Sequence, residues 1–461
     1  MTKPSEFTYV DLFAGCGGLS LGLESEGGRL VTAVERSPMA GETFYHNLVK
    51  RVESKDQWQQ YLSQSVGEQF REGLVVKELR EFLDSKVIIS ELKTVRPDVV
   101  VGGPPCQGFS LAGRRNPDDA RNQLPWQFLE LVEITSPKVV VIENVVGMRH
   151  RFSGDDEGDT FSQLKKALET SGPGYVVQGV EVNALHYGAP QHRPRLMIIG
   201  VRMDVASSKG FRSTSSLWRS RFKDELNEVE IPALAPVPTV SKAGARTIGE
   251  AIADLQSTQL PNTNETGFLA EMSERPWGVV PASGSTTNHV VRVHTEKTKA
   301  RFRLYQVFHK EGIDPRILGR INENPDKEQN GRLREKLNGL NFPVSSPDGF
   351  ILAKNLDEML ELVVELRTKK HSQRVLDWNQ PSRTVVTIGD DYVHPIEPRT
   401  FTVRELARFQ GFPNAFEFRS KETTGGLNRR NEVPQYSQVG NAVSPFLAKA
   451  VGKLICRILG D

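Results

Sequence analysis

The sequence DLFAGCGGLSLGLE, residues 11–24, follows the short apolar run Thr8–Leu12. Three of its glycines, Gly15, Gly17 and Gly18, stand where a buried strand would turn into a helix. Because glycine has no β-carbon, such a turn lets a ligand approach the backbone closely, and the first amides of the helix point towards it. The stretch therefore predicts a strand–turn–helix unit with a ligand site at the turn.

The next β-branched run, Leu30–Val34, is followed by Glu35. A carboxylate at this place can accept hydrogen bonds from both ribose hydroxyls of an adenosine-containing cofactor. The glycine spacing G-x-G-G differs from the G-x-G-x-x-G fingerprint of dinucleotide-binding proteins, which argues against a nicotinamide cofactor. On these residues alone, a tight turn with a purely structural role is an alternative.

The first 200 residues continue to alternate β-branched runs with amphipathic segments, which is typical of a parallel sheet covered by helices. We expect an α/β fold with a doubly wound, mostly parallel, Rossmann-like sheet. The polar, helix-like region Arg51–Arg71 is interpreted as an insertion after the second strand. The expected strands are Thr8–Leu12, Leu30–Val34, Asp98–Val101, Lys138–Glu143, Tyr175–Val182 and Leu196–Val201, and helices are expected at Gln123–Thr135 and Phe161–Thr170.

The bulk composition fits an ordinary soluble protein. The chain has 461 residues, 38% hydrophobic and 25% charged, with a net charge of +2. No stretch approaches the ~18 consecutive apolar residues of a membrane span, and the polar N-terminus lacks the apolar run of a secretory signal. Three widely separated cysteines, Cys16, Cys106 and Cys456, argue against a disulfide framework and a cysteine-rich zinc site. We expect a cytoplasmic protein that does not contact a membrane.

The length of the chain favours two domains, and the texture of the sequence changes after about Met203, where prolines and glycines become frequent. We expect residues 1–202 to form a catalytic and cofactor-binding domain and 203–380 a second, irregular domain. Residues 381–461 are expected to return to the first domain.

A basic stretch lies early in the expected second domain. Between Ser207 and Lys223 there are five cations and no acids, with three aromatic residues among them. Basic residues interleaved with aromatic ones occur on nucleic-acid surfaces, but a solvated linker with a few docking aromatics has the same composition. Both interpretations remain open at this stage.

One cysteine has an unusual setting. Cys106 lies in VGGPPCQGFS, directly after an expected strand, with two prolines before it and Gly108 after it. A lone cysteine is usually a small buried hydrophobe. Here the segment follows the carboxyl end of a parallel strand, where open α/β sheets bind their ligands, and a loop start near cations can activate a thiol as thiolate. The pattern favours a nucleophile.

Charged residues follow the next strands. Glu143 ends the strand Lys138–Glu143 at the same edge, where desolvation would suit its carboxyl group to give a proton or hydrogen bond to a ring nitrogen. Arg193 and Arg195, two apart on an extended segment, are expected to point to one face as anchors for a phosphate or a carbonyl oxygen. A salt-bridged strand cap and simple ion pairs are the alternatives.

Together these motifs resemble the cytosine-5 DNA methyltransferases, in that family's order and over roughly residues 7–202 and 381–459. The motifs are FAGCGG at 13–18, PPCQGFS at 104–110, ENV at 143–145, QHRPR at 191–195, RTFTVRELARFQGFP at 399–413 and SQVGNAVSP at 437–445. The resemblance implies methyl transfer from S-adenosylmethionine to carbon 5 of cytosine in double-stranded DNA, without a metal. It also implies that 203–380 is the target-recognition domain.

The resemblance assigns roles to residues. Cys106 would attack carbon 6 of a flipped cytosine, Glu143 would engage its N3, and Arg195, with Arg193, would anchor the nucleotide. The segment Gly108–Arg121 resembles the loop that closes over the base. The cofactor pocket would be lined by Phe13, Gly15, Gly17, Gly18, Leu19, Glu35, Pro104, Asn441 and Ala442.

The chain departs from the family pattern after its third strand, where a Gly-Asp-Ile-like segment usually contacts the adenine. The nearest counterpart is Val76–Leu79, which leaves the adenine contact open. Other classes to be weighed are a tRNA methyltransferase of the same family, a catalytically inactive DNA-binding relative and a nicotinamide oxidoreductase. A monomer with a cognate restriction or defence nuclease as partner is the expected setting.

Overall fold

The computed structural model describes residues 7–105, 123–149, 159–214, 216–257, 267–273, 277, 286–322, 324–368, 373–425 and 432–460. A large sheet dominates it, with the strand order β3-β2-β1-β4-β5-β7-β6-β8. The strands are β1 Phe7–Leu12, β2 Gly28–Val34, β3 Leu74–Val75, β4 Val99–Gly102, β5 Val139–Asn144, β6 Tyr175–Asn183, β7 Pro194–Arg202 and β8 Trp218–Arg219. All six expected strands are present, while the two-residue strands β3 and β8 were not expected.

One strand runs against the others. β7 pairs antiparallel with both β5 and β6, whereas the neighbouring pairs from β3 to β5, and β6 with β8, are parallel. The reversal has a consequence for function. Because β7 is reversed, its first residues lie beside the carboxyl end of β5, with Leu196 opposite Asn144. The segment QHRPR is thereby placed at the edge where open α/β sheets bind ligands.

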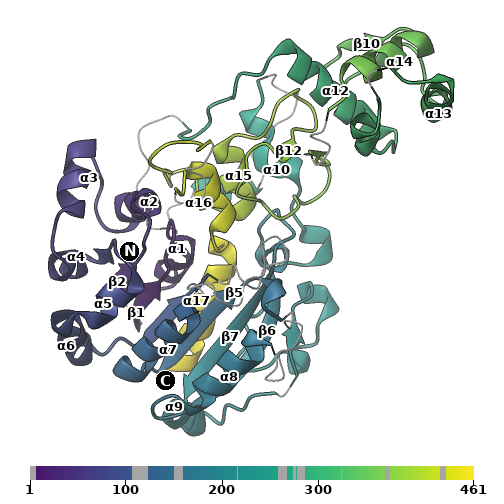
Figure 1. Ribbon diagram of the computed structural model, residues 1–461. Coiled ribbons are helices and arrows are strands. Elements are labelled where there is room, and N and C mark those ends of the chain that lie inside the picture. The colour runs from purple at the N-terminus through teal and green to yellow at the C-terminus, as the bar shows by residue number, and fades with distance from the viewer. Residues whose placement is uncertain are drawn as a thin grey trace.

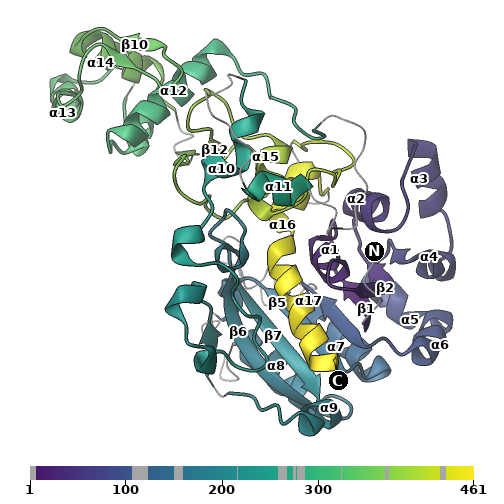
Figure 2. The same ribbon diagram turned by 180° about the vertical axis from the view of Figure 1, so that it is seen from behind.

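Helices cover both faces of the sheet, which confirms the doubly wound architecture (Figures 1 and 2). On one face, α1 and the C-terminal helix α17 pack together against the strands; on the other lie α5 to α8. Each helix turns a buried apolar stripe to the strands, as an amphipathic helix on a sheet does. Their bounds are α1 Gly18–Glu24, α5 Leu79–Asp84, α6 Lys86–Val95, α7 Leu124–Thr135, α8 Thr160–Thr170 and α17 Pro445–Leu459.

The region 51–71 forms two helices beside the sheet edge at β3, α3 Lys55–Leu62 and α4 Val66–Glu72. They pack with α2 Pro38–Leu48 through a cluster of aromatic side chains that includes Tyr45, Trp58 and Tyr61. The Tyr61 hydroxyl donates to the Leu74 carbonyl, and Gln69 accepts from the amide of Val76. The insertion therefore satisfies backbone groups of the edge strand that would otherwise be free to pair with another chain.

The C-terminal segment packs against the first 200 residues. It contributes β12 Tyr392–Val393, α15 Val403–Gln410, α16 Gln435–Asn441 and α17. The contact of α17 with α1 depends on Gly22, because a β-carbon there would lie 2.3 Å from the β-carbon of Ala448. Figure 2 shows α17 lying along the sheet next to α1.

Residues 203–380 do not pack as one unit. Ala206, Leu234, Ile248 and Ile252 belong to the same core as α1 and α17, and β8 extends the large sheet. This first part contains α9 Met203–Ser208, α10 Ile248–Ile252 and α11 Gly267–Ser273. The boundary at 203 therefore does not coincide with a change of core.

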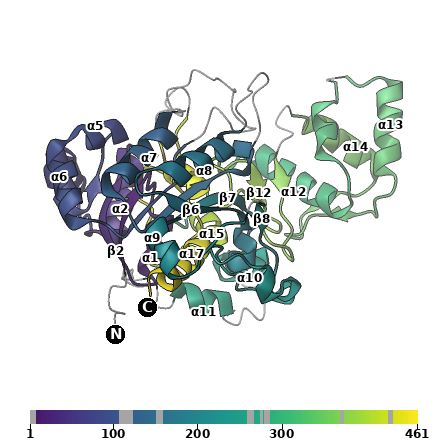
Figure 3. The ribbon, with the colours of Figure 1, turned by 90° about the horizontal axis from the view of Figure 1, so that it is seen from below.

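Residues 296–366 form a body, called the helical protrusion below, around an apolar cluster that also includes Val393 of β12. Figure 3 shows it standing away from the sheet. Its elements are α12 Glu296–Lys310, α13 Lys327–Leu337, β9 Val344–Ser345, β10 Ile351–Ala353 and α14 Leu356–Glu365; the short β11 Arg374–Val375 follows it and pairs with β12. Among the described residues, every helix is too short or too polar to cross a bilayer.

Candidate active site

The turn after β1 has a backbone that its sequence explains. Phe13, Gly15 and Gly17 have φ angles of 61°, 58° and 97°, a region that glycine adopts at little cost. The amide of Gly15 donates to Glu35 Oε2 at 2.9 Å, and the amide of Ser37 donates to Oε1 at 2.7 Å. Both oxygens of the expected ribose-binding carboxylate are thus held by backbone groups, and burial raises the pKa of Glu35.

The C-terminal segment closes this turn from the other side. A β-carbon on Gly18 would lie 2.2 Å from the carbonyl oxygen of Val443. Ala442, next to Val443, is buried, whereas Asn441 is exposed. The structure therefore brings the expected residues Gly18, Asn441 and Ala442 together although more than 400 residues separate them.

The turn has room for a ligand. A β-carbon on Gly15 would meet no atom within 4 Å, so the space beside this glycine is open, while Leu19 behind it is buried and Phe13 half-buried. An open cradle of left-handed glycines beside a fixed carboxylate fits the adenosine end of S-adenosylmethionine.

Asp11 was missed by the sequence analysis. Its carboxylate is buried at the end of β1 and accepts a hydrogen bond of 2.6 Å from the Ser20 hydroxyl of α1. Burial, with a smaller contribution from the nearby Glu35, raises the pKa of Asp11 to about 7. A signal was available, because Asp11 is the one acidic residue in the apolar run Thr8–Leu12.

The segment expected near the adenine follows β3. Val76 and Leu79 are buried, whereas Glu78 is exposed at the start of α5. Arg36, the neighbour of Glu35, donates to Glu78 Oε1 at 3.3 Å. Of these residues, Glu78 is therefore the polar group that lies beside the ribose-binding carboxylate.

The residues expected to be catalytic follow the carboxyl ends of β4 and β5 and the start of β7, which together are called the catalytic edge below. This edge begins where β4 ends. The Asn144 side chain donates to the carbonyl of Pro104 at 2.9 Å, and a β-carbon on Gly103 would lie 3.0 Å from Glu143 Oε2. The first half of the GGPPC segment therefore runs directly past the end of β5. Cys106 itself and the segment Gly108–Arg121 lie outside the described residues.

Glu143 and Arg195 form an ion pair across β5 and β7. Arg195 Nε lies 2.8 Å from Glu143 Oε1, and the two side chains are 12% and 11% exposed. A guanidinium holding a carboxylate in so confined a place fixes both groups at the edge. The two residues that the sequence placed on separate strands thus share one site.

Arg193 has a different environment. It is buried, and its guanidinium donates to the carbonyls of Val385, Gly440 and Ala442 at 2.8–3.1 Å. Burial, and to a smaller extent the neighbouring Arg195, lowers its pKa. Arg193 precedes β7 rather than alternating within it, so the spacing of two does not place it beside Arg195. Its side chain ties the sheet to the C-terminal segment.

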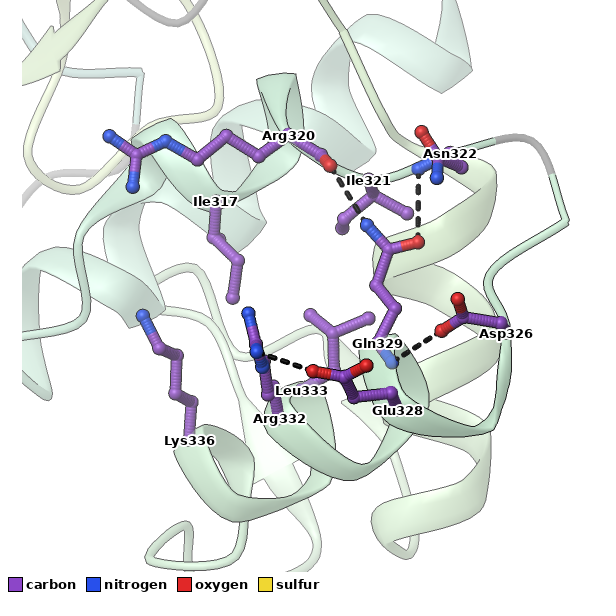
Figure 4. A pocket seen from close by; sticks show the side chains of 10 residues that line it. All are labelled: Ile317, Arg320, Ile321, Asn322, Asp326, Glu328, Gln329, Arg332, Leu333 and Lys336. Carbon is purple, nitrogen blue, oxygen red and sulfur yellow. Dashed lines mark hydrogen bonds and ion pairs between the residues drawn. The ribbon is translucent and has the colours of Figure 1, made fainter.

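A cavity of about 370 Å³ lies elsewhere, in the helical protrusion (Figure 4). Ile317, Ile321 and Leu333 are apolar residues of its lining, and Arg320, Arg332 and Lys336 add three cations. None of the expected site residues lines it. Within the described part of the chain, no three His, Cys, Asp or Glu side chains gather as metal ligands would.

Comparison with known proteins adds to this geometry. A family model described as C-5 cytosine-specific DNA methylase matches residues 7–457. The Type II methyltransferase M.DdeI of Desulfomicrobium norvegicum is 28% identical over 449 residues, covering 97% of this chain and 88% of that protein. The Type II methyltransferase M.AgeI of Thalassovita gelatinovora is 29% identical over 486 residues, covering 97% and 98%.

A similar structure has also been solved. A prophage-encoded protein of E. coli, described as a DNA modification methyltransferase, is 23% identical with a TM-score of 0.52, covering 99% of this chain and all of that one. At this identity the likeness concerns the fold. It agrees with the mostly parallel, helix-covered sheet described above.

Proposed function

The chain belongs to the C-5 cytosine-specific DNA methylase family, and we propose that Cys106, Glu143 and Arg195 perform its chemistry on a cytosine swung out of the DNA helix. The reaction is the transfer of a methyl group from S-adenosylmethionine to carbon 5 of cytosine. The cofactor supplies an electrophilic methyl group on a sulfonium. The protein has to make carbon 5 a nucleophile.

Cys106 does this by covalent addition. Carbon 5 of cytosine is too weak a nucleophile to attack the sulfonium methyl, but addition of a thiolate to carbon 6 converts the ring to an enamine. After methyl transfer, the proton on carbon 5 leaves and the thiolate is eliminated, which regenerates the free cysteine. The base must first leave the stack, at a cost of roughly a few kcal/mol.

Glu143 and Arg195 receive the ring. The carboxyl group of Glu143 engages N3, so that electron density pushed into the ring by the thiolate is stabilised there. Arg195 is placed to hold the carbonyl oxygen next to N3, and its ion pair with Glu143 orients both groups before the base arrives. We assign Arg193 a supporting role, because its guanidinium is already used by three carbonyls.

The cofactor is held at the glycine turn. Glu35 accepts the ribose hydroxyls, and the backbone of Phe13 to Leu19 forms the cradle. Pro104 contributes from the catalytic edge, and Asn441 and Ala442 from the C-terminal segment. Glu78 is the polar residue of this chain that we assign to the adenine.

The observation that carries the assignment is the Glu143–Arg195 pair directly beside the Gly103–Pro104 backbone. It is tested with DNA containing 5-fluorocytosine, because fluorine cannot leave as the proton does and elimination stalls. Wild type with S-adenosylmethionine is expected to form a denaturation-resistant adduct and Cys106→Ala none. An adduct with Cys106→Ala would show that another residue is the nucleophile.

The relatives are named Type II methyltransferases, and we infer a modification enzyme of this kind, monomeric and cytoplasmic, with a cognate nuclease as partner. The test is co-expression with candidate nucleases encoded beside it, followed by bisulfite sequencing of the host DNA. Methylation of tRNA without methylation of DNA would favour the tRNA alternative.

Residues 203–380 are proposed to choose the DNA sequence. The helical protrusion supports this, since it has its own core and can vary without disturbing the sheet. Between Val290 and Lys336 there are twelve Lys or Arg against seven Asp or Glu. Exchange of 203–380 for the same region of a relative with another target is expected to move methylation to that relative's site. A chimera that keeps the original site would overturn the proposal.

A further inference from the structure

The basic stretch Ser207–Lys223 lies nearer the catalytic edge than its place in the sequence suggests. Its strand β8 runs parallel to β6, with Arg219 opposite Glu181. Because the two strands run in the same direction, the chain that leaves β8 heads for the carboxyl end of β6, which lies at the same edge of the sheet as the carboxyl ends of β4 and β5. Arg221 is the second residue after β8 and is exposed.

Hydrogen bonds of the preceding residue, Ser220, hold the backbone at Arg221 in place at that edge. Its neighbour Ser220 accepts from the amide of Asn183, the last residue of β6, at 3.0 Å, and shares a hydrogen bond of 2.8 Å with the His186 ring. The Asn183 side chain in turn accepts from the amide of Arg193 at 2.9 Å. The backbone beside Arg221 is therefore connected to the segment that carries Arg195 by two hydrogen bonds, from Asn183 to Ser220 and from Arg193 to Asn183.

A second pair of residues continues the same edge. The amide of His192 donates to the Ser382 carbonyl at 2.8 Å, and the Thr384 hydroxyl donates to the His192 carbonyl at 2.8 Å. Arg383 stands between these two partners of His192. Both His192 and Arg383 are exposed, while Arg195, three residues after His192, faces Glu143.

Within the described residues, the exposed side chains of this edge are not engaged by carboxylates. In the described part of the chain, no carboxylate forms an ion pair with Arg221, His192 or Arg383, whereas Arg219 is paired with Glu181 at 3.1 Å. Asp224 and Glu225 follow Lys223, and their carboxylates contact Lys242 instead. These two acids are thus engaged by Lys242 and leave Arg221, His192 and Arg383 available.

We propose that Arg221, His192 and Arg383 form a phosphate track that holds the DNA backbone beside the flipped cytosine. Duplex DNA carries one negative charge per about 1.7 Å of its axis, and cations on a rigid surface bind it independently of sequence. The backbone of each of the three residues is held by a strand or by backbone hydrogen bonds, so the residues can fix the position of the DNA backbone. This inference rests on the proposed function, because it takes DNA as the substrate.

Salt-dependent DNA binding tests the track. Arg221→Ala and Arg383→Ala are each expected to lower the slope of log affinity against log salt by about 0.9, the value for one phosphate contact. The loss of affinity should be equal for two duplexes of unrelated sequence. The double variant should lose both contributions, and Arg221→Lys should keep the wild-type slope because the charge remains.

Arg29→Ala is the matched control. Arg29 is exposed near the start of β2, at the opposite end of the parallel strands, and should not change the slope. The melting shift with S-adenosylmethionine should be unchanged in every variant, which shows that the fold is intact. Wild-type slopes in Arg221→Ala and Arg383→Ala would overturn the track alone, whereas a wild type that binds no DNA would overturn the proposed function with it.

Discussion

Around the cofactor turn, carboxylates are buried with few cations near them, whereas in the helical protrusion they lie exposed beside arginines. Burial raises the pKa of Asp11 and of Glu24 to about 7. In the protrusion, the hydrogen bonds from Arg316 lower the pKa of Asp314 to about 2. The first region holds groups in place at a cost in free energy, and the second is stabilised mainly by its apolar cluster.

The difference indicates where substitutions should affect chemistry and cofactor binding. The cofactor turn and the catalytic edge are joined to the C-terminal segment by buried hydrogen bonds from Gln191 and Arg193. The protrusion is joined to the C-terminal segment by Gln306, which donates to the carbonyls of His394 and Glu397. Changes that break the joining hydrogen bonds of Gln191 and Arg193 should therefore affect chemistry and cofactor binding together, whereas changes in the second region should leave both intact.

The largest effect is expected at the catalytic edge. Glu143→Gln removes the acid that we propose engages N3 while keeping the size of the side chain, and should slow methyl transfer by roughly 10²–10⁴. DNA affinity and the melting shift with S-adenosylmethionine should change little, because the contact strengthens only as the ring accepts the thiolate. Single-turnover rates and binding measured on the same sample check this. Equal losses of rate and affinity would mean that Glu143 is structural.

A matched pair of core substitutions compares the two regions directly. Leu337, in the protrusion, and Leu454, in α17, are both buried. Replacing either with alanine should cost about 2–5 kcal/mol of local stability. Leu337→Ala should leave the cofactor melting shift unchanged, while Leu454→Ala should weaken it because α17 supports α1. Hydrogen exchange read by mass spectrometry would locate each loss, and protection lost across the whole chain in Leu337→Ala would refute the separation.

How much of this comparison could be predicted from the sequence depends on how far apart along the chain the interacting residues lie. Strands β1, β2 and β4 to β7 are long apolar runs and were predicted, while β3 and β8 have two residues each and no period to detect. Glu143 follows from its strand end. The burial of Arg193 does not, since its acceptors Gly440 and Ala442 come almost 250 residues later. The change in texture after Met203 predicted a separate region 203–380, but it did not single out the protrusion within it, because the protrusion's boundary depends on packing that composition does not encode.

The third expected effect concerns the closure of the cofactor turn. Gly18→Ala places a β-carbon 2.2 Å from the Val443 carbonyl oxygen, so the C-terminal segment must move, at a cost of about 1–3 kcal/mol. We expect affinity for S-adenosylmethionine to fall by roughly ten-fold or more, which calorimetry measures. Gly67→Ala is the control, because its β-carbon would meet no atom within 4 Å. Equal affinities in the two variants would show that Val443 does not shape the pocket.

The smallest effect is a pH dependence, and its sign differs between the two regions. The folded pKa of Asp11, about 7, lies above the ordinary value near 4. Between these values the folded chain keeps a proton that the unfolded chain releases, so stability falls as pH rises through this window, by up to about 1.4 kcal/mol per pH unit. Asp11→Asn cannot titrate and can still accept the Ser20 hydrogen bond. Urea unfolding at several pH values should show that the stability of the wild type declines between pH 4 and 7 and that this decline is shallower in Asp11→Asn, with Glu24 and Glu35 contributing equally to both.

In Asp314→Asn the difference from wild type should instead appear in acid, because a lowered pKa gives stability that is lost as pH falls towards 2. Parallel profiles for wild type and Asp11→Asn would mean that Asp11 is not buried as a carboxyl group, and the contrast between the two regions would then rest on packing alone.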